Sequence, residues 1–465
     1  MTNLMKKDAL KISKLISREI GREKVSIDED ILEKYSYDET SDLFNSPDIL
    51  VRAESAIDVS KTLMICTQYK IPLTPRGAGS GVTGGAVPIT GGVVLSLEKM
   101  NKIIEIDTEN MVAVVEPGVI TSSIQKAALQ VGLMYPPDPA SLDSCSIGGN
   151  VAEGAGGPKA IKYGTTKDYI LGLEFVLPNG DIINTGGKFV KNVTGYNLIG
   201  LLTGSEGTLA VITRIILRLI PAPLKTVDLL IPFDSIEEAL KTISQILHNK
   251  IIPSTLEFME ENAIKLVAKY LKEEMPFPDA RAHLLVQIDG NSDEEINHYL
   301  EKLHDLPDIS TKIIVAETNI QKKRIWKARR SIRDAIQNES KIFLSEDTVI
   351  PRSNILKFLK ELKNILNSLN LYSIMFGHAG DGNVHTDILK GDMNYSEWEM
   401  MLPNLKNRIY KTAISFEGTI TGEHGIGYLR KNFLPLALSN QEIAILKRIK
   451  SAFDPDLILN PKKIF

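Results

Sequence analysis

The stretch PRGAGSGVTGGAVP at residues 75–88 decides the fold, because it packs five glycines into one loop. Gly79, Gly81 and Gly84 match the G-x-G-x-x-G spacing of a dinucleotide-binding fingerprint, but a true fingerprint opens a helix directly after its strand. Here AVPITGGVVLSL follows (86–97), and its proline and paired glycines predict a turn and then a strand. We therefore reject a Rossmann domain for a nicotinamide cofactor.

The glycines still indicate a binding loop. Glycine allows positive φ and close backbone approach, so successive amide N–H groups can form a nest for an anion. A glycine-rich surface turn is the alternative. A second cluster, PPDPASLDSCSIGGNVAEGAGGPKAIKYG at 136–164, carries six more glycines and weakens that alternative. Two such loops favour one extended dinucleotide that is held against the backbone.

The composition limits the class of protein. The chain has 465 residues, 43% of them hydrophobic and 24% charged, with a net charge of −4, which indicates an ordinary globular protein of two or three domains. No basic footprint for nucleic acid is present. The two cysteines form no C-x-x-C motif, which excludes iron–sulfur and cysteine–zinc sites and fits a reducing compartment. No signal peptide or membrane-length apolar run is visible, so we expect a cytoplasmic protein with no transmembrane segment.

The pattern along the chain predicts an α+β protein. Residues 1–46 read as a helical segment, and 47–223 as a glycine-rich domain with β-rich runs. After PAP at 221–223 glycine nearly vanishes, and amphipathic helices alternate with strands over 224–420. This alternation predicts a second domain of antiparallel sheet and helices. The remaining segment is 421–465.

GHAGDGNVH at 377–385 places turn-forming residues between His378 and His385. If that run reverses the chain, the two imidazoles can point the same way, which suits zinc, manganese or iron. TGEHGIG offers further ligands in Glu423 and His424. A surface hairpin with two incidental histidines is equally compatible with the spacing. IWKARRSIRDAI adds arginines suited to a carboxylate, although a basic run is usually a solvated helix face.

Several motifs together resemble a known superfamily. RGAGSGVTGG, PPDPASLDSCSIGGNVAEGAGG, KYGTTKDYILGLEFVLPNG and GSEGTLAVIT are similar to the PCMH-type FAD-binding domain of the vanillyl-alcohol oxidase superfamily. GHAGDGNVH, GTITGEHGIG and FDPDLILNP narrow the resemblance to FAD-linked 2-hydroxyacid dehydrogenases, the group of glycolate oxidase flavin subunits, D-lactate dehydrogenases and D-2-hydroxyglutarate dehydrogenases. The resemblance implies an FAD-binding domain of two α+β subdomains, a substrate (cap) domain of antiparallel sheet and helices, and a C-terminal helical segment that returns to the flavin.

The resemblance also implies which residues bind FAD. The pyrophosphate would lie on the first loop, at Arg76, Gly77, Ala78, Gly79, Ser80 and Gly81. The flavin would be lined by Asp138, Ser141, Gly148, Gly149, Asn150 and Asn460, and the adenine side by Glu206, Gly207 and Ile212. Relatives with covalent flavin often carry a histidine in the first loop. This loop has none, so we expect non-covalent FAD, and Cys145 reads as a small buried residue rather than a flavin anchor.

Catalytic roles follow from the same resemblance. It implies that His378, His385 and Glu423 bind a divalent metal, that His424 is the base and that Arg329 binds the substrate carboxylate. The implied reaction oxidises a small 2-hydroxyacid, D-lactate or glycolate, with the hydride passing to flavin N5. The implied partners are an iron–sulfur subunit, an electron-transfer flavoprotein or a quinone, and a second copy of the chain in a homodimer.

Two other functions are open at this point. One is a non-redox flavin-dependent transferase of the same superfamily, whose relatives carry a run of consecutive histidines where this chain has only Glu423-His424-Gly425. The other is an electron-carrying subunit without its own substrate, which the retained metal-type residues and base argue against. Hydroxyglutarate enzymes are expected to have a threonine at the position of Arg333 and a lysine near Ser345, so a dicarboxylate substrate is disfavoured.

Overall fold

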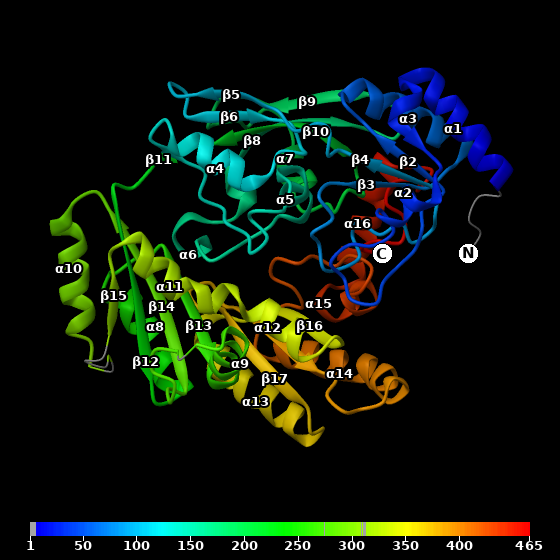
Figure 1. Cartoon of the computed structure of the whole chain (residues 1–465). Coiled ribbons are helices and arrows are strands. Elements are labelled where there is room, and N and C mark those ends of the chain that lie inside the picture. Colours follow the sequence, from blue (N-terminus) through cyan, green and yellow to red (C-terminus); the bar gives the residue numbers. More distant parts are fainter. Residues whose placement is uncertain (1–5, 274, 308, 310–312) are drawn as a thin grey trace. The chain divides into compact units, whose positions relative to one another are not determined.

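The computed structural model describes residues 6–273, 275–307, 309 and 313–465. The chain forms two compact units. Unit 1 consists of the chain up to Ala155, Thr165–Ala222 and Glu423–Phe465, and unit 2 of Gly156–Gly164 and Pro223–Gly422. Mixed sheets and helices in both units confirm the predicted α+β class (Figure 1).

The first sheet of unit 1 has the strand order β1-β2-β4-β3, in which β4 runs parallel to β2 and β3 while β1 is antiparallel. Its strands are β1 Val25–Ser26, β2 Ile49–Arg52, β3 Leu73–Arg76 and β4 Val93–Ser96. Helices α1 (Lys6–Ile20) and α3 (Ala56–Tyr69) share a hydrophobic core with these strands. The glycine-rich stretch between β3 and β4 contains no helix, which confirms the predicted turn and strand.

The N-terminal segment is less helical than predicted. After α1 the chain forms β1 and the short helix α2 (Glu29–Glu33), and residues 34–48 are not helical. Asp28 caps α2, because its side chain accepts hydrogen bonds from the amides of Asp30 and Ile31. Pairing of β1 with β2 makes this region part of the first sheet.

The second sheet of unit 1 is antiparallel, in the order β5-β6-β10-β8-β9. Its strands are β5 Ile103–Asp107, β6 Val112–Val115, β8 Ile170–Val176, β9 Ile182–Gly186 and β10 Val211–Arg218. A two-stranded ribbon joins β7 Leu133–Met134 to β11 Ile220–Pro221. The other helices of this unit are α4 Thr121–Leu129, α5 Ile147–Glu153, α7 Leu198–Leu202, α15 Leu434–Ala437 and α16 Asn440–Phe453.

Unit 2 is built on a seven-stranded sheet in the order β15-β12-β14-β13-β17-β18-β16, with every pair antiparallel as predicted. The strands are β12 Lys225–Phe233, β13 Thr255–Glu260, β14 Ala282–Gly290, β15 Ile314–Ala316, β16 Phe343–Val349, β17 Tyr372–His378 and β18 Asn383–Leu389. Every residue of β13 and β18 is buried, so both faces of these strands are covered.

Helices of unit 2 supply much of that cover. They are α6 Ala160–Tyr163, α8 Ile236–His248, α9 Glu261–Leu271, α10 Asp293–His304, α11 Asn319–Arg330, α12 Ile332–Glu339, α13 Ile355–Ser368 and α14 Tyr395–Ser415. Residues of α9, α11 and α12 share one hydrophobic cluster with Met259, Ile374 and Phe376 of the central strands. This unit also has the short 3-10 turn η3 Arg352–Asn354, while η1 Arg22–Lys24, η2 Thr166–Tyr169 and η4 Lys431–Phe433 belong to unit 1. In the part of the chain that is described, no helix is both long and apolar enough to span a bilayer.

His283 predicts acid sensitivity of unit 2. This β14 side chain is buried, its Nε2 lies 3.3 Å from the Phe277 carbonyl oxygen, and its Nδ1 has no hydrogen-bond partner among the described residues. Burial lowers the pKa of His283 from 6.5 to about 4, although the contact with Phe277 opposes the shift. Below pH 6.5 the His283 imidazole therefore binds a proton in the unfolded chain but stays neutral in the folded chain until the pH approaches 4. Stability should fall as the pH drops towards 4, by up to about 3 kcal/mol.

The substitution His283→Phe should flatten this loss, since the phenyl ring cannot take up a proton. Chemical denaturation followed by circular dichroism between pH 7 and pH 4 measures the slope. The exposed His248, at the end of α8, gives the matched control His248→Phe. Equal slopes for wild type and His283→Phe would contradict the assignment.

Candidate active site

A serine that the sequence reading missed joins the two glycine loops of unit 1. Ser146 Oγ accepts hydrogen bonds from the amides of Ala78 (3.2 Å) and Gly149 (3.3 Å). A Cβ at Gly77 would lie 2.2 Å from that same oxygen, so only glycine lets the loops approach this closely. The expected neighbourhood of the two loops is therefore present, and Ser146 maintains it.

The first loop still presents backbone donors. Gly79 has φ +74°, which turns the chain in a way that suits glycine. Within the described residues, the amides of Gly79, Ser80 and Gly81 donate to no protein acceptor. Two of the predicted pyrophosphate residues are already engaged, since the Ala78 amide contacts Ser146 and the buried Arg76 guanidinium donates to the Tyr37 carbonyl oxygen (2.7 Å). A nest at 79–81 fits a phosphate group.

Asn460 lies where four segments of unit 1 meet. Its Nδ2 donates to the carbonyl oxygens of Gly85 (3.1 Å) and Glu206 (2.8 Å), and its own amide donates to the Leu73 carbonyl oxygen (2.7 Å). Its Oδ1 is buried without a hydrogen-bond partner among the described residues. A buried acceptor is costly to leave unpaired, so this oxygen fits the N–H group of a bound cofactor.

Glu206, which was predicted beside the adenine, forms hydrogen bonds within the protein. Glu206 is buried, and its carboxylate accepts hydrogen bonds from the amides of Ile426 and Gly427, both at 2.7 Å. It therefore anchors the loop that carries His424, and its predicted place beside the adenine stays a prediction. Asp138 and Ser141 lie in the loop between β7 and α5, and Gly148 and Asn150 lie in α5. Gly207 lies next to Pro75, and Ile212 lies in β10.

GHAGDGNVH forms the predicted hairpin in unit 2. His378 ends β17 and pairs with Asn383 of β18, while His385 pairs with Phe376. Side chains two residues apart on a strand share a face, so the two imidazoles are diagonal neighbours on one face of the sheet. Their Nε2 atoms lie 3.4 Å apart. Two nitrogens that bind one tetrahedral ion at about 2.0–2.1 Å are separated by about 3.4 Å, so the geometry fits a shared metal.

The neighbouring strands add a carboxylate on each side of the histidines. Glu257 of β13 pairs in register with His378, and Asp347 of β16 pairs in register with His385. Directly paired residues lie on the same face, so four strands present the row Glu257, His378, His385 and Asp347. Neither carboxylate was predicted from the sequence.

Glu257 is fully buried between two partners. Its Oε1 lies 2.5 Å from His378 Nδ1, and its Oε2 accepts a hydrogen bond from Arg329 Nε at 2.8 Å. Burial by itself raises the pKa of the Glu257 carboxyl, but His378, Arg329 and His385 together outweigh burial and hold the pKa below its usual value. Glu257 is thus ionised at neutral pH, and it favours the His378 tautomer whose Nε2 can bind a metal.

Asp347 connects the sheet to the segment that carries the remaining predicted residues. Its side chain lies 3.7 Å from His385 Nδ1 and accepts hydrogen bonds from Asn383 Nδ2 (2.6 Å), Thr421 Oγ1 (3.0 Å) and the Gly422 amide (3.0 Å). Glu423 and His424 follow Gly422 directly in the chain. Asp347 therefore fixes the start of the TGEHG segment.

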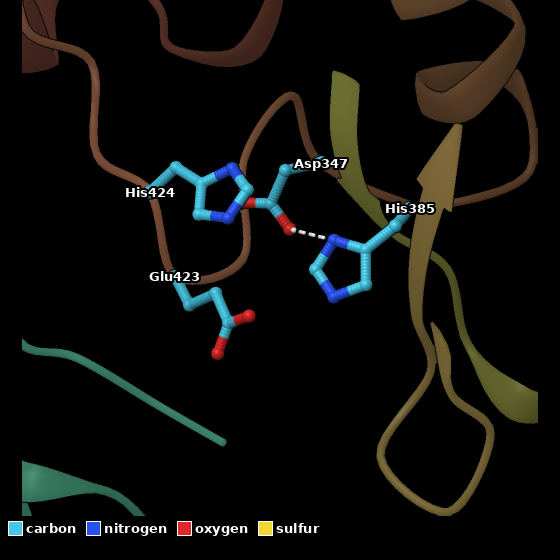
Figure 2. Close-up of side chains that lie close together, drawn as sticks. All are labelled: Asp347, His385, Glu423 and His424. Carbon is cyan, nitrogen blue, oxygen red and sulfur yellow. Dashed lines mark ion pairs between the residues drawn. The ribbon is translucent and has the colours of Figure 1, made fainter. Parts of the chain in front are cut away.

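Figure 2 shows His424 and Glu423 projecting from adjacent positions of this segment, with Asp347 and His385 close by. One potential ligand atom from each of these four residues lies within 4.8 Å of the others. His378 is not a member of this group of four, but it faces His385 through the Nε2 contact. The structure thus gathers the predicted His385, Glu423 and His424, with Asp347 as an addition.

The three candidate arginines have different surroundings. Arg329 is largely buried and its guanidinium lies 4.6 Å from the Phe376 ring, next to the histidine row. Arg333 lies 3.6 Å from Asp387 and stacks on Phe343 at 4.6 Å. Arg330 is exposed beside Trp326. Of the three, only Arg329 contacts the Glu257–His378 pair, so the basic run is not a uniformly solvated face.

Comparison with known proteins identifies the family. Residues 47–186 match an FAD binding domain, and residues 222–464 match the C-terminal domain of FAD linked oxidases. The chain belongs to the FAD-linked oxidases. It is therefore a flavoprotein oxidoreductase, and FAD is its cofactor, as the resemblance implied.

The chain is similar over nearly its whole length to several relatives. It is 40% identical to glycolate oxidase subunit GlcD of Bacillus subtilis, over 93% of this chain and 92% of that one. It is 37% identical to D-lactate dehydrogenase of Anaerostipes hadrus (96% of each chain) and 31% identical to D-2-hydroxyglutarate dehydrogenase of Stutzerimonas stutzeri (95% and 96%).

Solved structures confirm the PCMH-type fold. The chain superposes on p-cresol methylhydroxylase with substrate bound at a TM-score of 0.83, with 19% identity over 99% of this chain and 97% of that one. An alkyldihydroxyacetonephosphate synthase gives a TM-score of 0.76, with 16% identity over 97% and 86%. Identities this low establish a shared fold alone.

The hairpin geometry predicts that zinc binding depends on both histidines. His378→Ala and His385→Ala should each weaken zinc binding by more than about 100-fold, because each removes one nitrogen of the facing pair. Competition with a chromophoric chelator measures the affinity. The exposed His298 on α10 provides the control His298→Ala, which should bind zinc like wild type. Wild-type affinity in either hairpin variant would exclude a shared metal at this position.

Proposed function

We propose that this FAD-linked oxidase oxidises a small 2-hydroxyacid, D-lactate or glycolate, to the 2-oxoacid with the help of a divalent metal. The observation that carries the proposal is the row of Glu257, His378, His385 and Asp347 with Arg329 beside it. It combines metal-type ligands and a carboxylate-binding cation on one sheet face. The names of the similar proteins, glycolate oxidase subunit and D-lactate dehydrogenase, agree with this substrate class.

The reaction defines what the residues must do. Oxidation removes a hydride from C2 of the acid and a proton from its hydroxyl group. FAD, when bound, supplies the hydride acceptor, and a divalent ion such as zinc, manganese or iron supplies a Lewis acid for the hydroxyl and carboxylate oxygens. His378, His385 and Glu423 are the proposed ligands. Three protein ligands leave room for the substrate, as in other catalytic metal sites.

Arg329 is the proposed anchor for the substrate carboxylate. A guanidinium has five N–H donors, and only the Nε donor is used by Glu257. The terminal nitrogens can form the paired hydrogen bonds that a carboxylate prefers. Contacts with Glu257 and Phe376 restrict the side chain, so less conformational freedom is lost when the substrate binds.

His424 is the proposed base for the hydroxyl proton. The imidazole ring carries a nitrogen lone pair, so it can accept a proton and release it again during turnover. His424 neighbours the Glu423 ligand in the chain, and Figure 2 shows both side chains beside His385. The anchoring of Gly422 by Asp347, and of Ile426 and Gly427 by Glu206, limits how far His424 can move.

The substrate is proposed to be an acid with a single carboxylate. Arg333 supports this, because Asp387 and Phe343 already occupy its guanidinium.

FAD is proposed to be non-covalent, since the nest at 79–81 contains no histidine. The reoxidant is proposed to be an iron–sulfur subunit, an electron-transfer flavoprotein or a quinone, in the cytoplasm, where the buried free thiols of Cys66 and Cys145 would stay reduced.

The proposal predicts that 2-hydroxyacids bleach the flavin. Under anaerobic conditions, D-lactate or glycolate should bleach the visible absorbance of the oxidised FAD, because the hydride passes to the flavin. Thorough chelation should slow the reduction at least tenfold, and added zinc or manganese should restore it. A panel of D- and L-2-hydroxyacids without any bleaching would refute the substrate class. Bleaching that is unchanged after chelation would refute the metal.

Loss of the base should separate chemistry from binding. His424→Ala should retain FAD and bind zinc within a few-fold of wild type, yet reduce its flavin about 100-fold to 10,000-fold more slowly, which is the usual contribution of a general base. Stopped-flow absorbance gives the rate. His298→Ala again serves as the control. A rate within threefold of wild type would exclude His424 as the base.

A further inference from the structure

One buried carboxylate contacts both a proposed metal ligand and the proposed substrate-binding arginine. Glu257 uses Oε1 for the Nδ1 of the metal-type ligand His378 (2.5 Å) and Oε2 for the Nε of Arg329 (2.8 Å). We propose that Glu257 is a positioning residue that fixes the metal ligand and the substrate-binding arginine relative to each other. The inference rests on the proposed function and adds to it a residue that touches neither substrate nor metal.

The arrangement follows from the sheet. Glu257 and His378 are direct cross-strand partners in β13 and β17, so their side chains meet without any loop adjustment. Arg329 comes from α11, which contacts the edge strand β15 and its neighbour β12, and reaches across to Glu257. A carboxylate is planar and rigid. When its two oxygens hold an imidazole and a guanidinium, the relative orientation of these two groups is set.

A second contact reinforces the same geometry. Phe376 lies two residues before His378 on β17 and therefore on the same face. Its ring lies under the Arg329 guanidinium at 4.6 Å and beside the His385 ring at 5.2 Å. Arg329 is thus held at Nε by Glu257 and on its flat face by Phe376. Its terminal nitrogens are the part that stays available for a substrate.

Glu257 also has an electrostatic role. A fully buried carboxylate is tolerated only when it is paired, and here both partners belong to the proposed site. Its negative charge holds the proton on His378 Nδ1, which leaves Nε2 as the lone-pair atom that faces His385. Without that charge the histidine is free to switch tautomer, and the metal loses a ligand part of the time.

The chain provides a matched control on the same strand. Glu260 is three residues further along β13, so it lies on the opposite face of the sheet. It is also buried, forms an ion pair with Lys363 and accepts a hydrogen bond from the Met375 amide (3.0 Å). Glu260→Gln therefore removes an equally buried charge from β13 without touching the histidine row.

The decisive measurement is zinc affinity without any substrate, by chelator competition on the FAD-loaded protein. Glu257→Gln should weaken zinc binding about 10-fold to 100-fold, the usual effect of removing an outer-shell carboxylate, while Glu260→Gln should stay within about threefold of wild type. Glu257→Asp keeps the charge and should recover part of the affinity. Equal affinities for Glu257→Gln and Glu260→Gln would overturn the inference.

A second readout tests the link to Arg329. Glu257→Gln should raise the KM for the hydroxyacid at saturating zinc by about tenfold or more, because the arginine loses one of its two restraints. Arg329→Lys should raise KM as well, yet leave zinc affinity within about threefold of wild type, since Glu257 still holds His378. An unchanged KM in zinc-saturated Glu257→Gln would overturn the link.

Failure of the proposed function has a different signature. If no hydroxyacid bleaches the wild-type flavin, the substrate class is wrong. The zinc comparison between Glu257→Gln and Glu260→Gln needs no substrate, so it still decides whether Glu257 positions His378.

Discussion

The pairing register of β13, β17, β18 and β16 is the constraint on which the candidate site depends. Direct partners bring Glu257 to His378 and Asp347 to His385, and the hairpin makes the two histidines diagonal neighbours. A slip of one residue in any of these pairings would place members of the row on different faces of the sheet. Because both faces of β13 and β18 are buried, such a slip would also disturb the hydrophobic core, so folding protects the geometry of the site.

The cost of burying a charge explains why each buried carboxylate of the row has several polar or charged partners. Glu257 and Asp347 are each fully buried, and an unpaired ionised carboxylate there would cost several kcal/mol or more. Glu257 is compensated by Arg329 and His378, and Asp347 by Asn383, Thr421 and the Gly422 amide. The same contacts that make these charges tolerable also fix the imidazoles, so the folding requirement and the proposed catalytic requirement are met by one set of interactions.

The sequence predicted those parts of the protein that have local signals. Turn formers between two histidines predicted the hairpin, and the proline and paired glycines after 75–88 predicted a turn and strand in place of a helix. Glu257, Asp347 and Ser146 had no such signal. Glu257 precedes its partner His378 by 121 positions, and it is one of two glutamates in the stretch TLEFME, which nothing in the sequence connects with the histidines. Only the order and register of the sheet place it at the site.

The proposed site residues also differ in how the fold holds them in place. His378 and His385 belong to strands whose positions the sheet determines, whereas Glu423 and His424 lie in a segment without helix or strand. Such a segment needs its own anchors, because no ladder of backbone hydrogen bonds restrains it. Asp347 supplies one before Glu423, and Glu206 supplies another after His424. The anchored amides thus lie on both sides of the three residues Glu423, His424 and Gly425, so these restraints do not depend on which side chains the segment carries.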